Sequence, residues 1–144
     1  MRYTLGAIGV GAALALSCVA GTSGTARAES AQPHSLYAPS SMVLTIGKGE
    51  DAATAAVQRA VLLRCRPTAG GDHPDAQAAC TELTLAGGNF EALLASDPNR
   101  ICPKIWDPVV VTADGVWQGQ RVSYSHTYAN SCIKTGGTGA VFGF

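Results

Sequence analysis

Short apolar runs with the composition of β-strands recur along the chain. Residues 42–46 read Met-Val-Leu-Thr-Ile and are followed by glycines, and residues 109–112 read Val-Val-Val-Thr. Both runs are rich in β-branched residues, which favour strands. Between positions 121 and 128, aromatic and apolar residues at even positions alternate with polar residues at odd positions. This alternation predicts a strand with one buried and one solvated face.

The connections between these runs are marked by glycine. Asp114-Gly115 follows the run at 109–112 and predicts the turn of a β-hairpin, with the return strand beginning at Val116. Glycines at 136, 137 and 139 predict a loop, after which residues 140–144 are expected to form a last short strand.

One segment has the pattern of an amphipathic helix. Pro74 is expected at its first helical position, with Asp72 or His73 as the cap, and Gly87-Gly88 is expected to end it. Apolar residues at 76, 79, 80 and 83 share one face, which turns Cys80 toward the core. Residues 55–65 are ambiguous, because an Ala-rich start favours a helix and Val-Leu-Leu at 61–63 favours a strand. We expect a strand from about Arg59.

The sum of these elements is an α+β fold. We expect an antiparallel sheet of about five strands, with one main helix and a short second helix packed on one face. The length of 144 residues leaves room for one domain.

The N-terminal segment is typical of a secretory signal. An apolar run from Leu5 to Ala20 follows a single charge at Arg2, and residues 26–28 read Ala-Arg-Ala, a cleavage pattern. We therefore predict a signal peptide at 1–28, a secreted, extracellular domain at 29–144, and a flexible arm at 29–40. A lipid-anchored Cys18 is the alternative, although the apolar residue before it sits one place too close.

Removal of residues 1–28 leaves eight basic and ten acidic residues, a net charge of −2. This balance argues against a nucleic-acid partner, which requires clustered positive charge. The chain would also have no membrane segment after signal removal. Four cysteines remain, and their even number in an exported chain predicts two disulfides with three possible pairings. Zinc is disfavoured, because no C-x-x-C pair or His–Cys spacing is present, and no metal or other cofactor is expected.

Residues 101–108, Ile-Cys-Pro-Lys-Ile-Trp-Asp-Pro, contain the most informative chemistry. The two prolines fix their own φ, restrict the residues before them and cannot donate to a sheet. The half-cystine pins one end. The expected result is a stiff, extended, exposed loop that presents Lys104 beside Ile105 and Trp106. Such a loop could serve a protease as a substrate-like ligand, because little entropy remains to be lost on binding. The segment could equally be a structural turn tied by a disulfide, with Trp106 in the core.

Two other functional classes are open at this stage. A small hydrolase is disfavoured, because G-x-S-x-G is absent beyond the signal and H-E-x-x-H is absent. His126 is interpreted as a partly buried histidine on an apolar strand face, and His73 as a residue at the helix start. A secreted binding or scaffold protein without inhibitory activity is the other alternative.

Several segments in order resemble the Streptomyces subtilisin inhibitor family. They are Leu-Tyr-Ala-Pro-Ser at 36–40, Cys-Pro-Lys-Ile-Trp-Asp-Pro-Val at 102–109, Asp-Gly-Val-Trp-Gln-Gly at 114–119, Arg-Val-Ser-Tyr at 121–124 and the closing Val-Phe-Gly-Phe at 141–144. The similarity covers nearly all of the chain from Leu36. It implies an inhibitor of serine proteases rather than an enzyme.

The resemblance also implies roles for particular residues. The disulfides would be Cys65–Cys80 and Cys102–Cys132, and the bond offered to the protease would be Lys104-Ile105. Ile101, Cys102 and Pro103 would fill the protease subsites before this bond, and Trp106 and Asp107 those after it. Asn130 would support the loop by hydrogen bonds, and the chain would form a homodimer through its sheet face. Familiar members carry Met at position 104, so Lys104 leaves open whether trypsin-like or subtilisin-like proteases are preferred.

Overall fold

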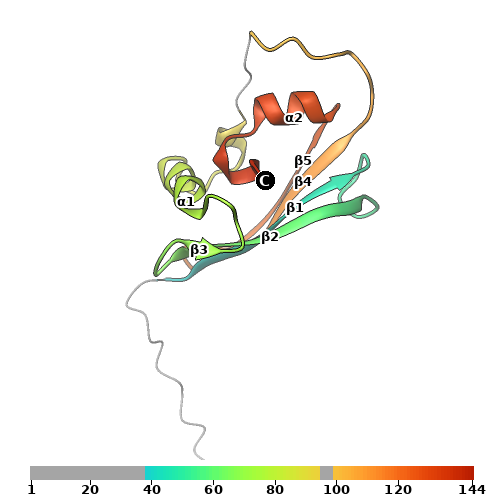
Figure 1. The fold of residues 1–144 in the computed structure, drawn as a ribbon. Coiled ribbons are helices and arrows are strands. Elements are labelled where there is room, and N and C mark those ends of the chain that lie inside the picture. Colours follow the sequence, from blue (N-terminus) through green and yellow to red (C-terminus); the bar gives the residue numbers. More distant parts are fainter. Residues whose placement is uncertain (1–37, 95–98) are drawn as a thin grey trace, which may run out of the picture. The chain divides into compact units, whose positions relative to one another are not determined.

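A five-stranded antiparallel sheet forms the centre of the fold (Figure 1). The computed structural model describes residues 38–94 and 99–144. The strands lie in the order β3-β2-β1-β4-β5, and every neighbouring pair runs antiparallel. Their bounds are Ser40–Lys48 (β1), Ala56–Arg66 (β2), Gly70–Gly71 (β3), Val109–Trp117 (β4) and Gln120–Tyr128 (β5).

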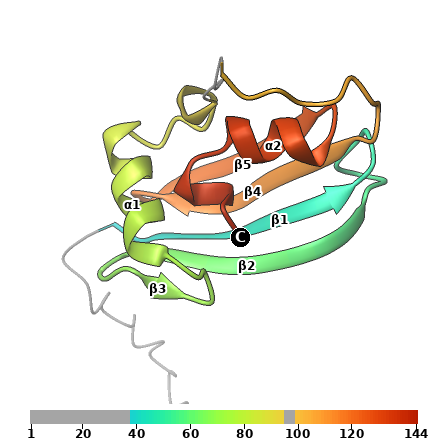
Figure 2. The ribbon, with the colours of Figure 1, turned by 45° about the horizontal axis from the view of Figure 1, so that its top comes forward.

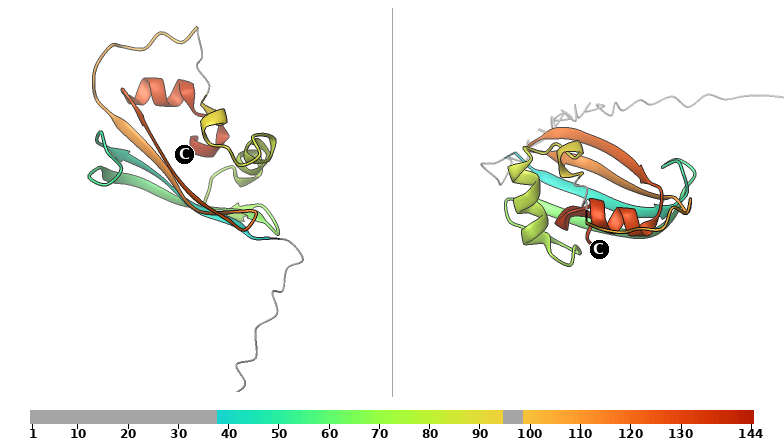
Figure 3. Two further views of the ribbon diagram at one scale, coloured as in Figure 1. Left: turned by 180° about the vertical axis from the view of Figure 1, so that it is seen from behind. Right: turned by 90° about the horizontal axis from the view of Figure 1, so that it is seen from above.

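The helices cover one face of this sheet (Figure 2; Figure 3). The main helix, α1, spans Ala76–Leu85, and the shorter α2 spans Ser131–Gly137. Two 3-10 turns, η1 at Glu91–Leu93 and η2 at Ala140–Phe142, complete this layer. The expected α+β class is confirmed, with a main helix and a short second helix packed on one face of a five-stranded sheet.

The core lies between the sheet and the helices. Leu44 at the centre of β1 is paired with Val61 on β2 and Ala113 on β4, and all three are buried. Paired residues of neighbouring strands point to the same face, so alternate residues of each strand enter the core. The helical layer contributes Leu83 and Phe142, both buried. Burial of such side chains stabilises the fold by about 1.5–3 kcal/mol each.

The opposite face of the sheet carries apolar side chains that remain accessible. Val43 and Leu62 are paired across β1 and β2 and are 44% and 37% exposed, and Val57 is 60% exposed. On the same face, the hydroxyls of Thr45 and Thr112 lie 2.7 Å apart across β1 and β4. No described residue of the helical layer covers this face (Figure 3).

The hairpin turn predicted at Asp114-Gly115 is wrong. Both residues lie inside β4, and the chain reverses three residues after Gly115, at Gln118-Gly119, where both φ angles are positive (48° and 79°). Gly115 has another role, because a Cβ there would overlap the backbone of Ser41 and Met42 on β1. The glycine was therefore a sign of close strand approach and not of a turn.

Other boundaries differ from the expected ones. The cap of α1 is Asp75, whose side chain accepts from the Ala78 N–H, and Pro74 lies before the helix. The expected end at Gly87-Gly88 is confirmed, since both glycines follow α1 with positive φ. The strand β2 begins at Ala56, three residues before the predicted start.

The C-terminal strand predicted at residues 140–144 is also wrong, since Ala140–Phe142 forms the 3-10 turn η2. Polar contacts with the helical layer hold this segment. The Val141 N–H donates to Glu82 at 3.0 Å, and buried Lys134 donates to the Phe142 carbonyl at 2.7 Å. The apolar residues therefore enter the core from a turn, without adding a strand to the sheet. The loop expected at residues 136–139 is in part helical, because α2 extends to Gly137.

The first disulfide joins the sheet to the main helix. Cys65 near the end of β2 is bonded to Cys80 on the buried face of α1. The predicted orientation of Cys80 toward the core is thus confirmed.

The predicted signal peptide at 1–28, Cys18 and most of the arm at 29–40 lie outside the described residues. Within the described part, no helix is long and apolar enough to span a membrane.

Candidate functional site

Residues 101–108 form an extended segment without helix or strand that leads into β4 (Figure 1). Its side chains project into solvent: Ile101 is 98% exposed, Ile105 and Trp106 are each 62% exposed, and Lys104 is exposed as well. An exposed Trp106 excludes the alternative in which its ring packs in the core. The segment is called the presenting loop below.

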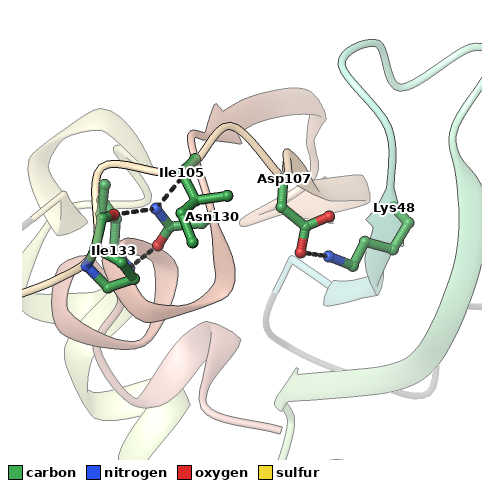
Figure 4. Close-up of polar contacts among 6 residues, drawn as sticks. Lys48, Ile105, Asp107, Asn130 and Ile133 are labelled. Atoms are coloured by element: carbon green, nitrogen blue, oxygen red, sulfur yellow. Dashed lines mark hydrogen bonds and ion pairs between the residues drawn. The ribbon is translucent and has the colours of Figure 1, made fainter.

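The side chain of Asn130 supports the middle of the presenting loop by hydrogen bonds to its backbone (Figure 4). Its Nδ2 group donates to the carbonyl oxygens of Pro103 and Ile105, each at 3.0 Å. These carbonyls stand on either side of Lys104, so the two bonds fix the backbone around the Lys104-Ile105 peptide. Asn130 is 5% exposed, which shields these hydrogen bonds from competing water.

The position of Asn130 is itself fixed by helix α2. It is the N-cap of α2, and its Oδ1 accepts from the Ile133 N–H at 3.0 Å (Figure 4). The amide oxygen of Asn130 thus caps the helix, and the amide nitrogen donates to the loop, so both polar atoms of the side chain are used. The sequence pattern gave no sign of this helix start, since only the resemblance pointed to Asn130.

The second disulfide ties the loop to the same helix. Cys102, two residues before Lys104, is bonded to Cys132 in the first turn of α2. The pairings Cys65–Cys80 and Cys102–Cys132, which the resemblance implied, are both present. Asn130 and Cys132 therefore make the junction of β5 and α2 a common support for the loop.

The part of the loop that follows Ile105 contacts a different region. The Asp107 N–H donates to the Ala129 carbonyl at 2.9 Å, and the Asp107 carboxylate forms an ion pair with Lys48 at the end of β1. The Trp106 ring nitrogen donates to the Glu50 carboxylate at 2.6 Å. Sequence reasoning missed Lys48 and Glu50, because two charged residues on either side of Gly49 indicate only a turn.

The remaining titratable candidates lie in ordinary structural environments. His73 is 6% exposed, accepts from the Asp75 N–H and lies 3.1 Å from the Val141 carbonyl oxygen. His126 packs edge-on against the Tyr128 ring, as expected for a partly buried histidine. Among residues 38–94 and 99–144, no three His, Cys, Asp or Glu side chains group as metal ligands.

An exposed peptide held by a disulfide and by main-chain hydrogen bonds defines a class of protein. It is a small disulfide-stabilised domain that presents an exposed peptide in a preformed conformation. Comparisons with known proteins identify the family. The family model for subtilisin inhibitor-like proteins matches residues 38–130.

Two curated relatives match nearly the whole chain. Kexstatin-1 of Streptomyces platensis is 52% identical over 145 residues and is covered completely, as is this chain. The subtilisin inhibitor of Streptomyces violaceus is 49% identical over 139 residues, which cover 96% of this chain and 95% of that protein.

A solved structure is similar as well. It is Streptomyces caespitosus sermetstatin in complex with Bacillus licheniformis subtilisin, with a TM-score of 0.70 and 43% sequence identity. The match covers 74% of this chain and 99% of the sermetstatin chain. The chain belongs to the subtilisin inhibitor-like family, whose members are protease inhibitors rather than enzymes. The resemblance noted from the sequence is thereby confirmed.

Proposed function

We propose that this protein is a secreted inhibitor of serine endopeptidases that binds them as a substrate would, with Lys104-Ile105 as the scissile bond. The observation that carries the proposal is the pair of hydrogen bonds from Asn130 to the Pro103 and Ile105 carbonyls. They immobilise the backbone on both sides of one peptide bond, which is the bond beside an exposed lysine.

Immobilisation favours tight binding. A flexible peptide loses conformational entropy when a protease cleft orders it, at about 1–2 kcal/mol per residue for the backbone. A loop that is already extended and anchored loses much less, and the difference appears as affinity. The family membership, and the subtilisin bound to sermetstatin, support a subtilisin-like protease as one target.

The chemistry would be that of serine-protease acylation, with an equilibrium that favours the intact peptide bond. The serine oxygen attacks the Lys104 carbonyl carbon, the bond to the Ile105 nitrogen breaks, and the catalytic histidine passes the serine proton to the leaving amine. Cys102 and Asn130 would keep the two new ends close together. The Ile105 amine then attacks the ester, the serine oxygen regains a proton, and the intact inhibitor re-forms.

The side chain at position 104 would choose the target. Lys104 carries an exposed cation on a long stem, which suits a pocket that ends in a carboxylate, as in trypsin-like proteases. A broader subtilisin pocket would accept the same stem. Ile101, Cys102 and Pro103 would fill the subsites before the bond, with Trp106 and Asp107 after it.

Two further parts of the proposal concern the state of the protein. The apolar run and the Ala-Arg-Ala sequence at 26–28 support export with cleavage after Ala28, which would release a protein starting at residue 29. The apolar side chains on the open sheet face support a homodimer through that face, since Val43, Val57 and Leu62 would there be removed from water.

The direct test is titration of subtilisin and of trypsin, each of known active-site concentration, with the secreted protein. A linear loss of activity to a stoichiometric endpoint is expected for at least subtilisin. Amino-terminal sequencing after slow cleavage should then give a new end at Ile105. A scaffold protein would leave both proteases active, and a hydrolase would itself cleave ester or peptide substrates; either result would refute the proposal.

A further inference from the structure

Two side chains, one at the end of β1 and one in the connection between β1 and β2, reach the part of the presenting loop that follows the scissile bond. Glu50 accepts from the Trp106 ring N–H at 2.6 Å. Lys48 forms an ion pair with Asp107 (Figure 4). These contacts join positions 56 and 59 residues apart in the sequence. They lie on the opposite side of the bond from the Cys102–Cys132 disulfide.

This side of the bond has no covalent tether of its own. After cleavage, the segment that begins at Ile105 is joined to the body only where Pro108 continues into β4. Main-chain contacts hold it at the Ile105 carbonyl, through Asn130, and at the Asp107 N–H, through Ala129. Glu50 and Lys48 supply the side-chain contacts of this segment among the hydrogen bonds described.

The backbone around these two residues is itself fixed to the body. The Thr127 hydroxyl on β5 donates to the Glu50 carbonyl at 2.9 Å, and the Gly49 N–H donates to the Pro108 carbonyl at 3.1 Å. Asp51 closes the turn by accepting from the Ala55 N–H at 2.8 Å. A side chain extended from such a backbone can position its partner, because the backbone does not move with the partner.

We propose that Lys48 and Glu50 are positioning residues that hold the released Ile105 segment in place and thereby favour resealing of the bond over its hydrolysis. The inference rests on the proposed function, since it concerns the fate of the cleaved inhibitor. In the acyl-enzyme, the Ile105 amine and a water molecule compete for the same ester carbonyl. Effective concentration decides this competition, and a displacement of about 1 Å can lower a rate a hundredfold.

The role differs from general stabilisation of the fold. The side chains of Lys48 and Asp107 are 35% and 58% exposed, and exposed ion pairs contribute little to folding stability. Their loss should therefore leave thermal unfolding nearly unchanged while the cleaved segment becomes free to leave. The ion pair should also weaken with salt, because the Debye length falls from about 10 Å at 0.1 M to about 3 Å at 1 M.

The experiment compares Lys48→Met and Glu50→Met, which each remove the contact, with matched controls, Arg121→Met and Glu91→Met. The controls remove the same charges from the far end of β5 and from η1. For each protein, three quantities are measured with subtilisin: the rate of cleavage at Lys104-Ile105 in a stoichiometric complex, the equilibrium ratio of cleaved to intact inhibitor, and the midpoint of thermal unfolding. The first two are repeated at 1 M salt.

The two test variants are expected to be cleaved roughly two- to fivefold faster, because each loses one exposed charged contact. The cleaved fraction at equilibrium should rise, with unfolding midpoints within about 2 °C of the unsubstituted protein. The charge exchange of Lys48→Asp with Asp107→Lys should restore slow cleavage, and the controls should match the unsubstituted protein. High salt should accelerate cleavage of the unsubstituted protein more than of Lys48→Met.

Slow cleavage of both variants beside normal inhibition would overturn this inference and leave the proposed function intact. Faster cleavage that follows a lowered unfolding midpoint would also overturn it, because it would then reflect loss of fold. Failure of the unsubstituted protein to inhibit, or cleavage at another bond, would instead refute the proposed function.

Discussion

The side chain of Asn130 joins the carbonyl oxygen of Ile105 to the first turn of α2. Its Nδ2 donates to that oxygen at 3.0 Å, while its Oδ1 accepts from the Ile133 N–H at the same distance. One amide therefore begins a helix and fixes the loop. A change at this position that keeps the cap and removes the loop bonds would separate the two roles.

Substitution of Asn130 provides that separation. Serine is a good N-cap but cannot reach both carbonyls, so Asn130→Ser should keep α2 while it frees the loop. We expect cleavage of the Lys104-Ile105 bond by subtilisin to accelerate about tenfold, as two partly buried hydrogen bonds are lost. Asn130→Ala should show the same acceleration and also lower the free energy of unfolding by about 1 kcal/mol. Chemical denaturation and a cleavage time course measure both effects. Equal cleavage by all three proteins would contradict the role of Asn130.

The side chain of Lys104 should set preference between proteases. Removal of one partner from a desolvated charge pair commonly costs 2–5 kcal/mol, or roughly thirty- to several-thousand-fold in affinity. Lys104→Met should therefore greatly weaken inhibition of trypsin and leave inhibition of subtilisin nearly unchanged. Inhibition constants for both enzymes provide the test. Equal losses against both would show that the scissile bond lies elsewhere.

The two disulfides should differ in what they control. They join residues 15 and 30 positions apart, and the chain-entropy model gives about 3 and 3.7 kcal/mol of stabilisation. Replacement of both Cys102 and Cys132 by serine should convert the inhibitor into a substrate, because that bridge ends two residues before the scissile bond.

The matched double replacement of Cys65 and Cys80 should lower the unfolding midpoint but leave the loop anchored. Cleavage by subtilisin is measured at a temperature where both variants are folded by circular dichroism. Slow cleavage of the Cys102/Cys132 variant would count against the assigned role.

The open face of the sheet should carry the dimer contact. Val43→Glu and Leu62→Glu place charges on this face, so each should shift the protein toward monomer at micromolar concentration. Leu85→Glu is the matched control, because Leu85 is 85% exposed on α1. Sedimentation equilibrium measures the mass. A monomeric unsubstituted protein would reject the dimer.

Alkaline unfolding should report on Tyr124. Burial, with a contribution from nearby Glu91, raises the pKa of Tyr124 to about 12. The protonated hydroxyl thus stabilises the fold fully below about pH 10, and this contribution is lost as the pH rises through about 12. Between pH 10 and 12, the free energy of unfolding measured in urea should therefore fall less steeply for Tyr124→Phe than for the unsubstituted protein. The pKa of Tyr128 is raised too, so some slope should remain in the variant. Identical slopes in the two proteins would contradict this assignment.

The layer architecture could be predicted from the sequence because its signals are local. The alternation at 121–128 predicts a strand in that same segment, and the glycines after α1 predict the end of the helix that they follow. Asp114-Gly115 misled, since the reason for Gly115 lies on another strand, in the backbone of Ser41 and Met42. The apolar end of the chain resembles a strand, but its polar partners on α1 and α2 make it a turn.

The site divides in the same way. The stiffness and exposure of the presenting loop follow from Cys102, Pro103 and Pro108, which act on their own neighbours. The roles of Asn130, Lys48 and Glu50 depend on contacts across 25 to 59 residues. Periodicity and turn residues carry information about neighbouring positions only, so they cannot predict contacts between residues this far apart in the sequence. Only the family resemblance pointed to Asn130.

The Asn130 side chain donates to backbone carbonyl oxygens, which every amino acid provides. The scaffold therefore holds position 104 without regard to which side chain stands there. Under the proposed function, a change of target would need one substitution at position 104 and would leave the support of the loop unchanged. An inhibitor built in this way would meet a changing set of proteases by substitution at one exposed position, while the junction of β5 and α2 stayed the same.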